Sequence, residues 1–234
     1  MQELDSRIDQ LRHQLASLPE HAQIAGLQAE HTRLVDQARD ARILVDDLNR
    51  EQRKADADVE QVKARRERDR SRMDQGLVTN PKDLERMGHE LESLERRISS
   101  LEDVEIEVME KLEEAQGTLD STAVELTAIE QQLADATTAR DARAVAINEE
   151  LTRAAADRAT AAEGLPDDLV ALYDKLRLSK QGVAAAPLRA RRCSGCQMTI
   201  NPSDLAVIAK APSDEVVRCE ECSRILVRTS ESGL

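Results

Sequence analysis

Two long stretches of the chain place their core residues at alternating steps of three and four positions, which is a heptad pattern. A pattern held over so many turns favours a coiled coil over an ordinary surface helix, because only a coiled coil keeps one narrow seam buried along its whole length. The first series comprises Ile24, Leu27, His31, Leu34, Ala38, Ala41, Val45, Leu48, Gln52, Ala55, Val59 and Val62. The second comprises Leu84, Met87, Leu91, Leu94, Ile98, Leu101, Glu105, Val108, Leu112, Ala115, Leu119, Thr122, Leu126, Ile129, Leu133 and Ala136, and it continues more weakly to Ile147.

A short connection, residues 76–81, separates the two series. Gly76 can end the first helix in a left-handed conformation. Asn80 can cap the second helix, with Pro81 at the first helical position and Asp83 placed for a reciprocal capping bond. So short a connection between long helices predicts an antiparallel hairpin. The second helix, of about 80 residues and about 120 Å, should end at Gly164.

The hairpin is preceded by a shorter heptad series whose phase differs from that of the later one. Pro19 lies at the change of phase, and proline cannot donate the helical hydrogen bond. We therefore expect a kink or a break around Leu18 and Pro19. The members of this series are Leu4, Ile8, Leu11, Leu15 and Leu18.

Beyond the hairpin the heptad pattern stops and shorter elements are predicted. Pro166 and the acids that follow it suit the start of a short helix that runs to about Ser179. Residues 182–187 are expected to form a linker or an extended strand, residues 198–200 and 225–228 short strands, and residues 202–209 a helical turn.

The expected fold is mainly α, with three parts in order along the chain. Residues 1–164 form the antiparallel coiled-coil hairpin, with its tip at about 76–81. Residues 165–187 form the short helix and linker, and residues 188–234 form a small zinc ribbon.

The zinc prediction comes from the four cysteines, which occur in two pairs, Cys193-Ser-Gly-Cys196 and Cys219-Glu-Glu-Cys222. Each pair places two thiolates on one tight turn, and two such turns supply the tetrahedral set that Zn²⁺ accepts. Because protein ligands fill all four positions, the spacing predicts one structural zinc ion and no catalytic one.

Other uses of four cysteines are less consistent with the chain. Disulfides need an oxidising compartment, and the sequence shows neither a signal peptide nor a transmembrane run. A thioredoxin-like pair needs only one C-x-x-C, and iron in a rubredoxin-type site uses the same four thiolates. We therefore expect a cytoplasmic zinc protein, with iron as the alternative metal.

Composition limits what the rest of the chain can do. It contains no Phe or Trp and a single Tyr, Tyr173, so a large globular core is not expected. The net charge of −13 opposes non-specific binding to nucleic acids. No phosphate-binding loop, dinucleotide turn or catalytic triad is visible, and His31 and His89 lack partners for a dyad. Enzymatic activity and a small-molecule substrate are therefore not expected.

Several local motifs give the chain a family likeness. Residues 79–85 look like a hairpin turn, residues 165–177 like a segment between coil and ribbon, and the two cysteine pairs like a ribbon. The sequence thus resembles the bacterial coiled-coil proteins that end in a four-cysteine zinc ribbon. The resemblance implies a non-enzymatic cytoplasmic protein, in a family with members linked to nucleic acids or to partners in the transcription apparatus.

The sequence departs from this family pattern in the ribbon. Gln197 and Ser223 stand where such knuckles often have glycine, and Val227 replaces a closing aromatic residue. None of these changes removes a metal ligand. The loss of the aromatic residue weakens a role in stacking on nucleic-acid bases.

A basic run next to the hairpin tip, residues 63–72, is a candidate phosphate-binding surface. Across the hairpin it faces the acidic residues of 85–94, so interhelical ion pairs are the alternative interpretation, and the one we favour. The basic residues of the run are Lys63, Arg65, Arg66, Arg68, Arg70 and Arg72.

A second candidate surface consists of arginines that flank the two cysteine pairs. Closure around a metal would gather them at one end of the ribbon, where they could bind an anion or offset the charge of the thiolates. These arginines are Arg189, Arg191, Arg192, Arg218 and Arg224.

The sequence is therefore interpreted as an adaptor. Its coil would bind a protein partner, and its ribbon would bind nucleic acid or a second protein. The alternative is a scaffold or chaperone-like coiled coil that makes no contact with nucleic acid. No membrane association is expected, and both a monomer and a dimer are compatible with the pattern.

Overall fold

The computed structural model describes residues 1–234. The chain divides into two compact units, one made of Met1–His21 with Thr138–Leu234 and the other of Ala22–Thr137. The two long helices pass through both units, and each unit is described below by itself. The helices lack any stretch that combines the length and the apolar character needed to cross a membrane.

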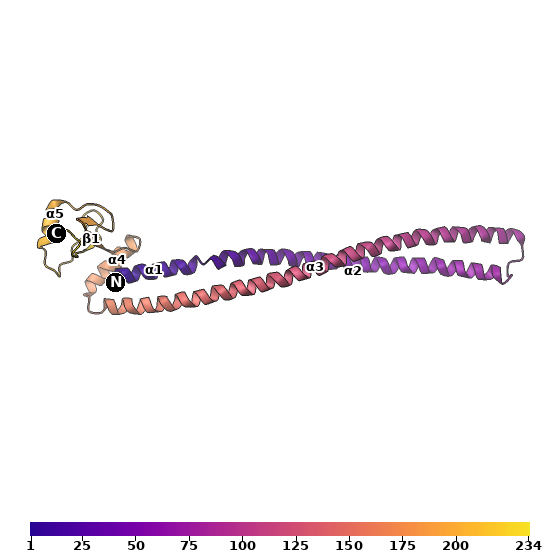
Figure 1. The fold of residues 1–234 in the computed structure, drawn as a ribbon, viewed down its shortest axis with the longest axis horizontal. Coiled ribbons are helices and arrows are strands. Elements are labelled where there is room, and N and C mark those ends of the chain that lie inside the picture. Colours follow the sequence, from indigo (N-terminus) through magenta and orange to yellow (C-terminus); the bar gives the residue numbers. More distant parts are fainter. The chain divides into compact units, whose positions relative to one another are not determined.

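In the unit Ala22–Thr137, two long helices lie side by side and run in opposite directions (Figure 1). They belong to α2, Pro19–Asp74, and α3, Pro81–Ala162. Every position of the two predicted heptad series is buried or half-buried, and Leu34 at 1% and Val59 at 2% are the least exposed of them. The predicted antiparallel coiled-coil hairpin is therefore confirmed.

The hairpin tip follows the predicted capping, with one exception. Gly76 has a φ of 64°, and the Lys82 N–H donates to Oδ1 of Asn80 at 3.0 Å. The expected reciprocal bond from Asp83 is wrong, because that carboxylate instead accepts from Nη2 of Arg86 at 2.6 Å. An arginine one helical turn along satisfies the charge of the carboxylate, which a neutral backbone N–H does not.

Replacing Asn80 by Ala is expected to destabilise the first turn of α3 by about 1 kcal/mol, because the capping acceptor is lost. Hydrogen exchange of the amides of residues 81–84 measures this local opening. Thr79→Ala is the matched control, since no bond to the Thr79 side chain is present. Equal exchange in Asn80→Ala and the wild type would contradict the capping role.

The predicted break near Pro19 is confirmed. The first helix, α1, spans Gln2–Ala16, and α2 begins at Pro19. Ser17 ends α1 by donating its N–H and its hydroxyl to the carbonyl of His13 at 2.9 and 2.7 Å. The break falls where the heptad phase changes. Because of it, both α1 and α2 can bury their own apolar residues, such as Leu11 and Ile24.

In the other unit, the chain leaves α3 at Ala162, two residues before the predicted end. Gly164 adopts a φ of 81° in the turn that follows. The next helix, α4, spans Asp167–Ser179 and precedes the ribbon. Tyr173 and Leu176 of α4 form a buried cluster with Ala184.

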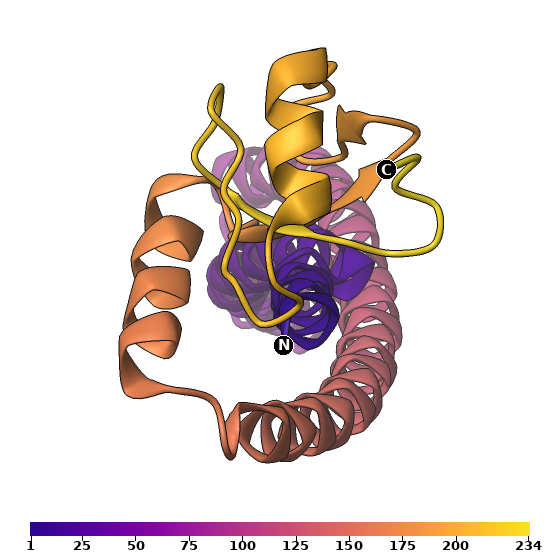
Figure 2. The same ribbon diagram turned by 90° about the vertical axis from the view of Figure 1, so that its left-hand side faces the viewer.

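The ribbon contains a small sheet and one helix (Figure 2). Its strands are β1, Ala185–Arg189; β2, Arg192–Cys193; and β3, Ile225–Val227, and its helix is α5, Pro202–Lys210. The order is β2-β1-β3, with β1 antiparallel to β2 and parallel to β3.

One predicted strand is wrong. Residues 198–200 form no strand, and only Thr199 pairs with Arg192 as an isolated bridge. The pairing stops there because Pro202, without an N–H, begins α5 three residues later.

A buried ionic cluster joins α1 to α4 and to the end of α3. Asp5, whose side chain is 2% exposed, accepts a hydrogen bond from Oη of Tyr173 at 2.7 Å. Arg158 donates to the same carboxylate at 3.2 Å, and Arg177 lies 3.5 Å from it. Burial, followed by the hydrogen bond to Asp5, raises the pKa of Tyr173, so the phenol keeps its proton and remains a donor.

Gln2 ties the start of the chain to the ribbon. Its Oε1 accepts from the N–H groups of Ala184 and Ala185 at 2.8 and 3.1 Å, and its Nε2 donates to the carbonyl of Gly182 at 2.9 Å. The side chain thus satisfies three backbone groups at the entry to β1. Residues that are far apart in sequence therefore hold the ribbon onto α1 and α4.

Candidate metal centre

The first knuckle begins at the end of β2. The N–H of Gln197 donates to the carbonyl of Cys193 at 2.8 Å, and the N–H of Cys193 donates to the carbonyl of Met198 at 3.0 Å. Gln197 has a φ of 63°, the left-handed region that favours glycine. These bonds close a tight turn that carries Cys193 and Cys196 on one side.

The second knuckle repeats this backbone pattern. The N–H of Ser223 donates to the carbonyl of Cys219 at 2.7 Å, and the N–H of Cys219 donates to the carbonyl of Arg224 at 2.9 Å. Ser223, at the position equivalent to Gln197, also has a φ of 63°. Both knuckles therefore form the same tight turn, although neither has a glycine after its second cysteine.

The two knuckles bring the four sulfur atoms into one cluster. The Sγ atoms of Cys193 and Cys222 lie 3.8 Å apart, as do those of Cys196 and Cys219, and all four lie within 4.8 Å of one another. A tetrahedron with metal–sulfur bonds of about 2.3 Å has sulfur–sulfur edges of about 3.8 Å. The four cysteines are free thiols, and their arrangement fits one tetrahedral ion of the zinc type.

The surroundings of the thiols shift their proton affinities in different directions. Burial raises the pKa of Cys193, and it raises the pKa of Cys219 to about 12. Burial acts in the same direction on Cys222, but hydrogen bonds from Arg224 and from neighbouring thiols outweigh it and lower its pKa to about 7. A bound cation is therefore required to keep Cys193 and Cys219, the two buried cysteines, as thiolates at neutral pH. Binding of the cation releases their protons.

Comparison with known families agrees with this geometry. Residues 1–181 match the CT398-like coiled-coil hairpin domain, and residues 192–226 match the C4-type zinc ribbon domain. The chain belongs to the CT398-like coiled-coil hairpin family. The resemblance stated from the sequence, a coiled coil with a four-cysteine ribbon, is confirmed.

Relatives of this CT398-like protein align along most of its length. It is 35% identical to "Uncharacterized protein Rv2229c" of Mycobacterium tuberculosis H37Rv over 225 residues, which cover 96% of this chain and 91% of that protein. A solved structure from Mycobacterium smegmatis is 31% identical with a TM-score of 0.80, covering 97% of this chain and 94% of that one. CT398 from Chlamydia trachomatis, at 21% identity, a TM-score of 0.68 and the same coverage, shows the likeness in fold alone.

Two arginines of this CT398-like protein stabilise the knuckles from equivalent positions. Arg192 donates from Nε and Nη2 to the carbonyl of Gln197 at 3.3 and 2.9 Å. Arg218 donates from Nε to the carbonyl of Ser223 at 3.0 Å. Each arginine directly precedes the first cysteine of its pair and binds the residue that follows the second. The repeated Arg-Cys-x-x-Cys spacing in the sequence is the signal for this role.

Arg218→Ala is expected to speed the loss of the metal to a chelator about tenfold, as removal of groups that hold metal ligands in place generally weakens binding by that order. A colorimetric chelator competition on the zinc-loaded full chain measures the rate. Lys210→Ala is the matched control, because Lys210 is an exposed cation of the ribbon that makes no ion pair. Equal rates for the two variants would remove Arg218 from the support of the knuckle.

The other ribbon arginines also make bonds within the protein. Nε of Arg189 lies 3.0 Å from the Glu231 carboxylate, and Nε of Arg191 donates to the carbonyl of Gly233 at 3.0 Å. Arg224 donates to the carbonyl of Val183 at 2.8 Å. Arg189 and Arg191 are exposed, whereas Arg224 is half-buried. The structure therefore gives all five predicted ribbon arginines an intramolecular partner.

The basic run of residues 63–72 forms the predicted ion pairs across the hairpin, but only Glu90 of the three acidic partners lies in the expected segment, residues 85–94. Lys63 binds Glu102 at 2.8 Å, Arg66 binds Glu95 at 2.9 Å, and Arg65 pairs with Glu90. Arg70 lies 4.0 Å from Asp74 on its own helix. Interhelical ion pairs thus engage three of the six basic residues, an intrahelical pair engages Arg70, and Arg68 and Arg72 remain without an ion pair.

The coil also exposes large apolar side chains outside its seam. Ile106 is 55% exposed and Val124 is 71% exposed on α3, and Ile43 and Leu44 are half-exposed on α2. Two grooves of about 660 and 630 Å³ flank the hairpin in this region; Met109 lines the first, together with Ile106, and Leu44 lines the second. Heptad analysis missed these residues because it selects the seam between the two helices and not the outer faces.

Proposed function

We propose that this CT398-like protein is a non-enzymatic adaptor, in which the coil binds a protein partner and the metal-stapled ribbon presents a second binding surface. The observation that carries the proposal is the apolar surface of α2 and α3. The heptad residues form the hairpin seam, and Ile106, Met109 and Leu44 lie outside it with about half of their surface exposed. Exposed apolar patches of this kind are typical of protein interaction sites.

One structural Zn²⁺ is the cofactor that the four thiols favour. The tetrahedral S₄ set also accepts iron, so metal analysis of protein purified from its own cells decides between the two. A four-cysteine metal site needs its thiols unoxidised, and this requirement supports a location in the reducing cytoplasm.

The histidines support the non-enzymatic part of the proposal. His31 lies 3.5 Å from Glu130, and His89 lies 3.9 Å from Glu92, in both cases on the coil. Neither pair includes a serine or cysteine nucleophile within a hydrogen-bonded series of the kind that hydrolases use. His31 lies in the half-buried seam and His89 on an exposed face of α3, each beside a single carboxylate.

The adaptor function is tested by recovering the tagged full chain from its own cells, with and without nuclease treatment. Proteins that remain bound after nuclease treatment and are lost from the variant Ile106→Ser/Met109→Ser are the expected result. Val145→Ser is the matched control, because Val145 is an exposed valine of α3 that lines neither groove. Equal recovery of every partner by the groove variant and the control would contradict the role of the coil surface.

Nucleic-acid binding is the second candidate function, and the free arginines favour it. Arg68 and Arg72 lie in the basic run without ion pairs, although the net charge of −13 opposes the association. Replacing both by Glu should abolish salt-dependent RNA or DNA binding in a filter assay. Arg53→Glu/Lys54→Glu, which reverses two exposed cations of α2 outside the run, is the matched control and should leave binding unchanged. Absence of binding by the wild type would leave the protein-binding adaptor alone.

A further inference from the structure

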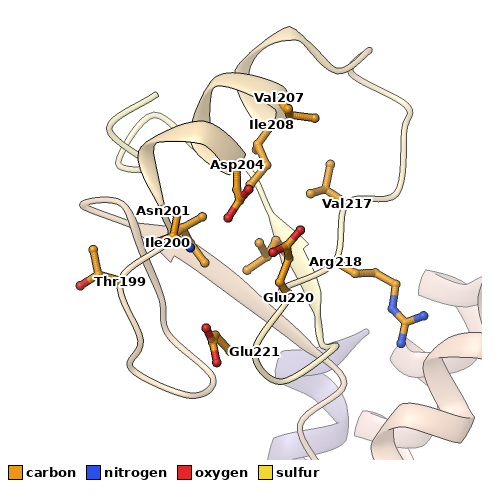
Figure 3. Close-up of a pocket in the computed structure, with 11 residues that line it drawn as sticks. Thr199, Ile200, Asn201, Asp204, Val207, Ile208, Val217, Arg218, Glu220 and Glu221 are labelled. Atoms are coloured by element: carbon orange, nitrogen blue, oxygen red, sulfur yellow. The ribbon is translucent and has the colours of Figure 1, made fainter.

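The ribbon contains a small pocket between α5 and the second knuckle (Figure 3). Its volume is about 160 Å³, close to the roughly 150 Å³ of a cavity that holds one benzene molecule. The pocket is therefore too small for a nucleotide and large enough for a single side chain. Its apolar lining comes from Ile200, Val207, Ile208, Val217 and Leu226.

Three carboxylates line the same pocket, Asp204 from α5 and Glu220 and Glu221 from the knuckle turn. None of the three forms an ion pair. The only side-chain bond to any of them comes from the neighbouring hydroxyl of Ser203, which donates to Asp204 at 3.3 Å. The pocket therefore combines apolar walls with unpaired negative charge.

Arg218 is the one cation among the lining residues, and it does not neutralise this charge. Its Nε donates to the carbonyl of Ser223, and Figure 3 shows its guanidinium directed away from Asp204 and Glu220. The same view shows Asp204 reaching into the pocket from α5 and Glu220 reaching in from the opposite wall. A cation that entered between them would meet two carboxylates without displacing an existing ion pair.

Lysine and arginine side chains match this combination. Each has an apolar stem that packs against aliphatic walls and a cationic head that binds carboxylates with charge-assisted hydrogen bonds. A phosphate or an acidic side chain would be repelled by the carboxylates of Asp204 and Glu220. A purely aliphatic side chain would fill the walls and leave the carboxylates unpaired.

We propose that this pocket binds the lysine or arginine side chain of a protein partner. The inference rests on the proposed adaptor function, for which it names the chemistry of the ligand at the ribbon. It places a basic protein segment on the face formed by α5 and the second knuckle. The negative charge of this face opposes the binding of nucleic acid there.

Three blocked pentapeptides test the pocket on the zinc-loaded full chain. They have the sequence Ala-Ala-X-Ala-Ala with Lys, Arg or norleucine at X, and norleucine keeps the stem of lysine without its charge. Methyl NMR signals of Ile200, Ile208 and Leu226 report on the pocket walls. Saturable shifts with the Lys or Arg peptide, at least fivefold stronger than with norleucine, are the expected result. Equal binding of all three peptides, or no saturable shift with Lys or Arg, would overturn the proposal.

A matched pair of variants locates the binding. Asp204→Asn/Glu220→Gln should reduce the affinity for the Lys peptide to that for norleucine. Asp214→Asn/Glu215→Gln removes the same charge from exposed ribbon residues outside the pocket and should leave it unchanged. Zinc content and the methyl spectrum of each variant check that the ribbon is folded. Unchanged affinity in the pocket variant would overturn the assignment.

The same pocket variant separates this inference from the adaptor function. If it recovers every cellular partner of the wild type while the groove variant Ile106→Ser/Met109→Ser does not, the pocket proposal fails and the adaptor function stands. Loss of a partner from the pocket variant, with full recovery by Asp214→Asn/Glu215→Gln, supports the pocket.

Discussion

Cys219→Ser is expected to abolish metal binding and unfold the ribbon while leaving the helical signal of the protein nearly intact. Cys219 is 2% exposed and lies in the buried cluster of the ribbon with Leu188 and Leu226. Binding of a structural zinc ion supplies roughly 10–16 kcal/mol in small domains, far more than so small an apolar core. Without its fourth thiolate the ribbon therefore loses its main source of stability.

The helices should persist because most of them have their own core. The 56 residues of α2 and the 82 of α3 bury their heptad seam without any ribbon residue, whereas α5 contributes only nine residues to the helical signal. Circular dichroism at 222 nm measures helicity, and metal analysis by mass spectrometry measures zinc. We expect the zinc to be lost and the helical signal to fall by the small share that α5 contributes.

Ser194→Ala is the matched control for this variant. Ser194 lies between the ligands of the first knuckle, and its hydroxyl makes no bond in the structure. The control should keep its zinc and its ribbon. Loss of most of the helicity in Cys219→Ser would show that the coil depends on the ribbon, contrary to the expectation.

The features that were predictable from the sequence are those set by local spacing. The heptad series located the seam, Pro19 located the break, and Gly76 and Asn80 located the tip, since each depends on residues within a few positions. The cysteine pairs specified the candidate metal centre for the same reason. A C-x-x-C turn carries its geometry within four residues.

The features that were missed depend on contacts between distant residues. The bond between Asp5 and Tyr173 joins positions 168 apart in the sequence, and Gln2 binds backbone groups some 180 positions away. The ribbon pocket requires α5 to pack over the second knuckle, which no periodicity reports. The strand expected at 198–200 failed because Thr199 pairs at only one position before the chain turns into α5.

Asp5→Ala is expected to destabilise the junction of α1 and α4 by about 2 kcal/mol, because the buried phenol of Tyr173 loses its main hydrogen-bond acceptor. The carboxylate accepts from the phenol of Tyr173 and from Arg158, and it lies 3.5 Å from Arg177. Arg158 retains Asp174 and Arg177 retains Asp9, so neither arginine becomes unpaired. The buried phenol, by contrast, is left with only a long bond of 3.3 Å to Gln2.

Hydrogen exchange of the amides of α1 and α4 measures this loss, since it reports local opening separately from the stability of the hairpin. Asp9→Ala is the matched control. Asp9 lies on the same helix and also binds Arg177, but its side chain is 43% exposed, so a cost below about 1 kcal/mol is expected.

Tyr173→Phe removes the hydroxyl alone and should cost about 1 kcal/mol. A double variant, Asp5→Ala/Tyr173→Phe, should then cost less than the two single changes together, because both remove the same hydrogen bond. Equal protection of these amides from exchange in Asp5→Ala and Asp9→Ala would mean that the buried cluster stabilises the junction no more than a surface ion pair does. Gln2 and the apolar cluster around Leu176 would then be the contacts that hold the ribbon onto α1 and α4.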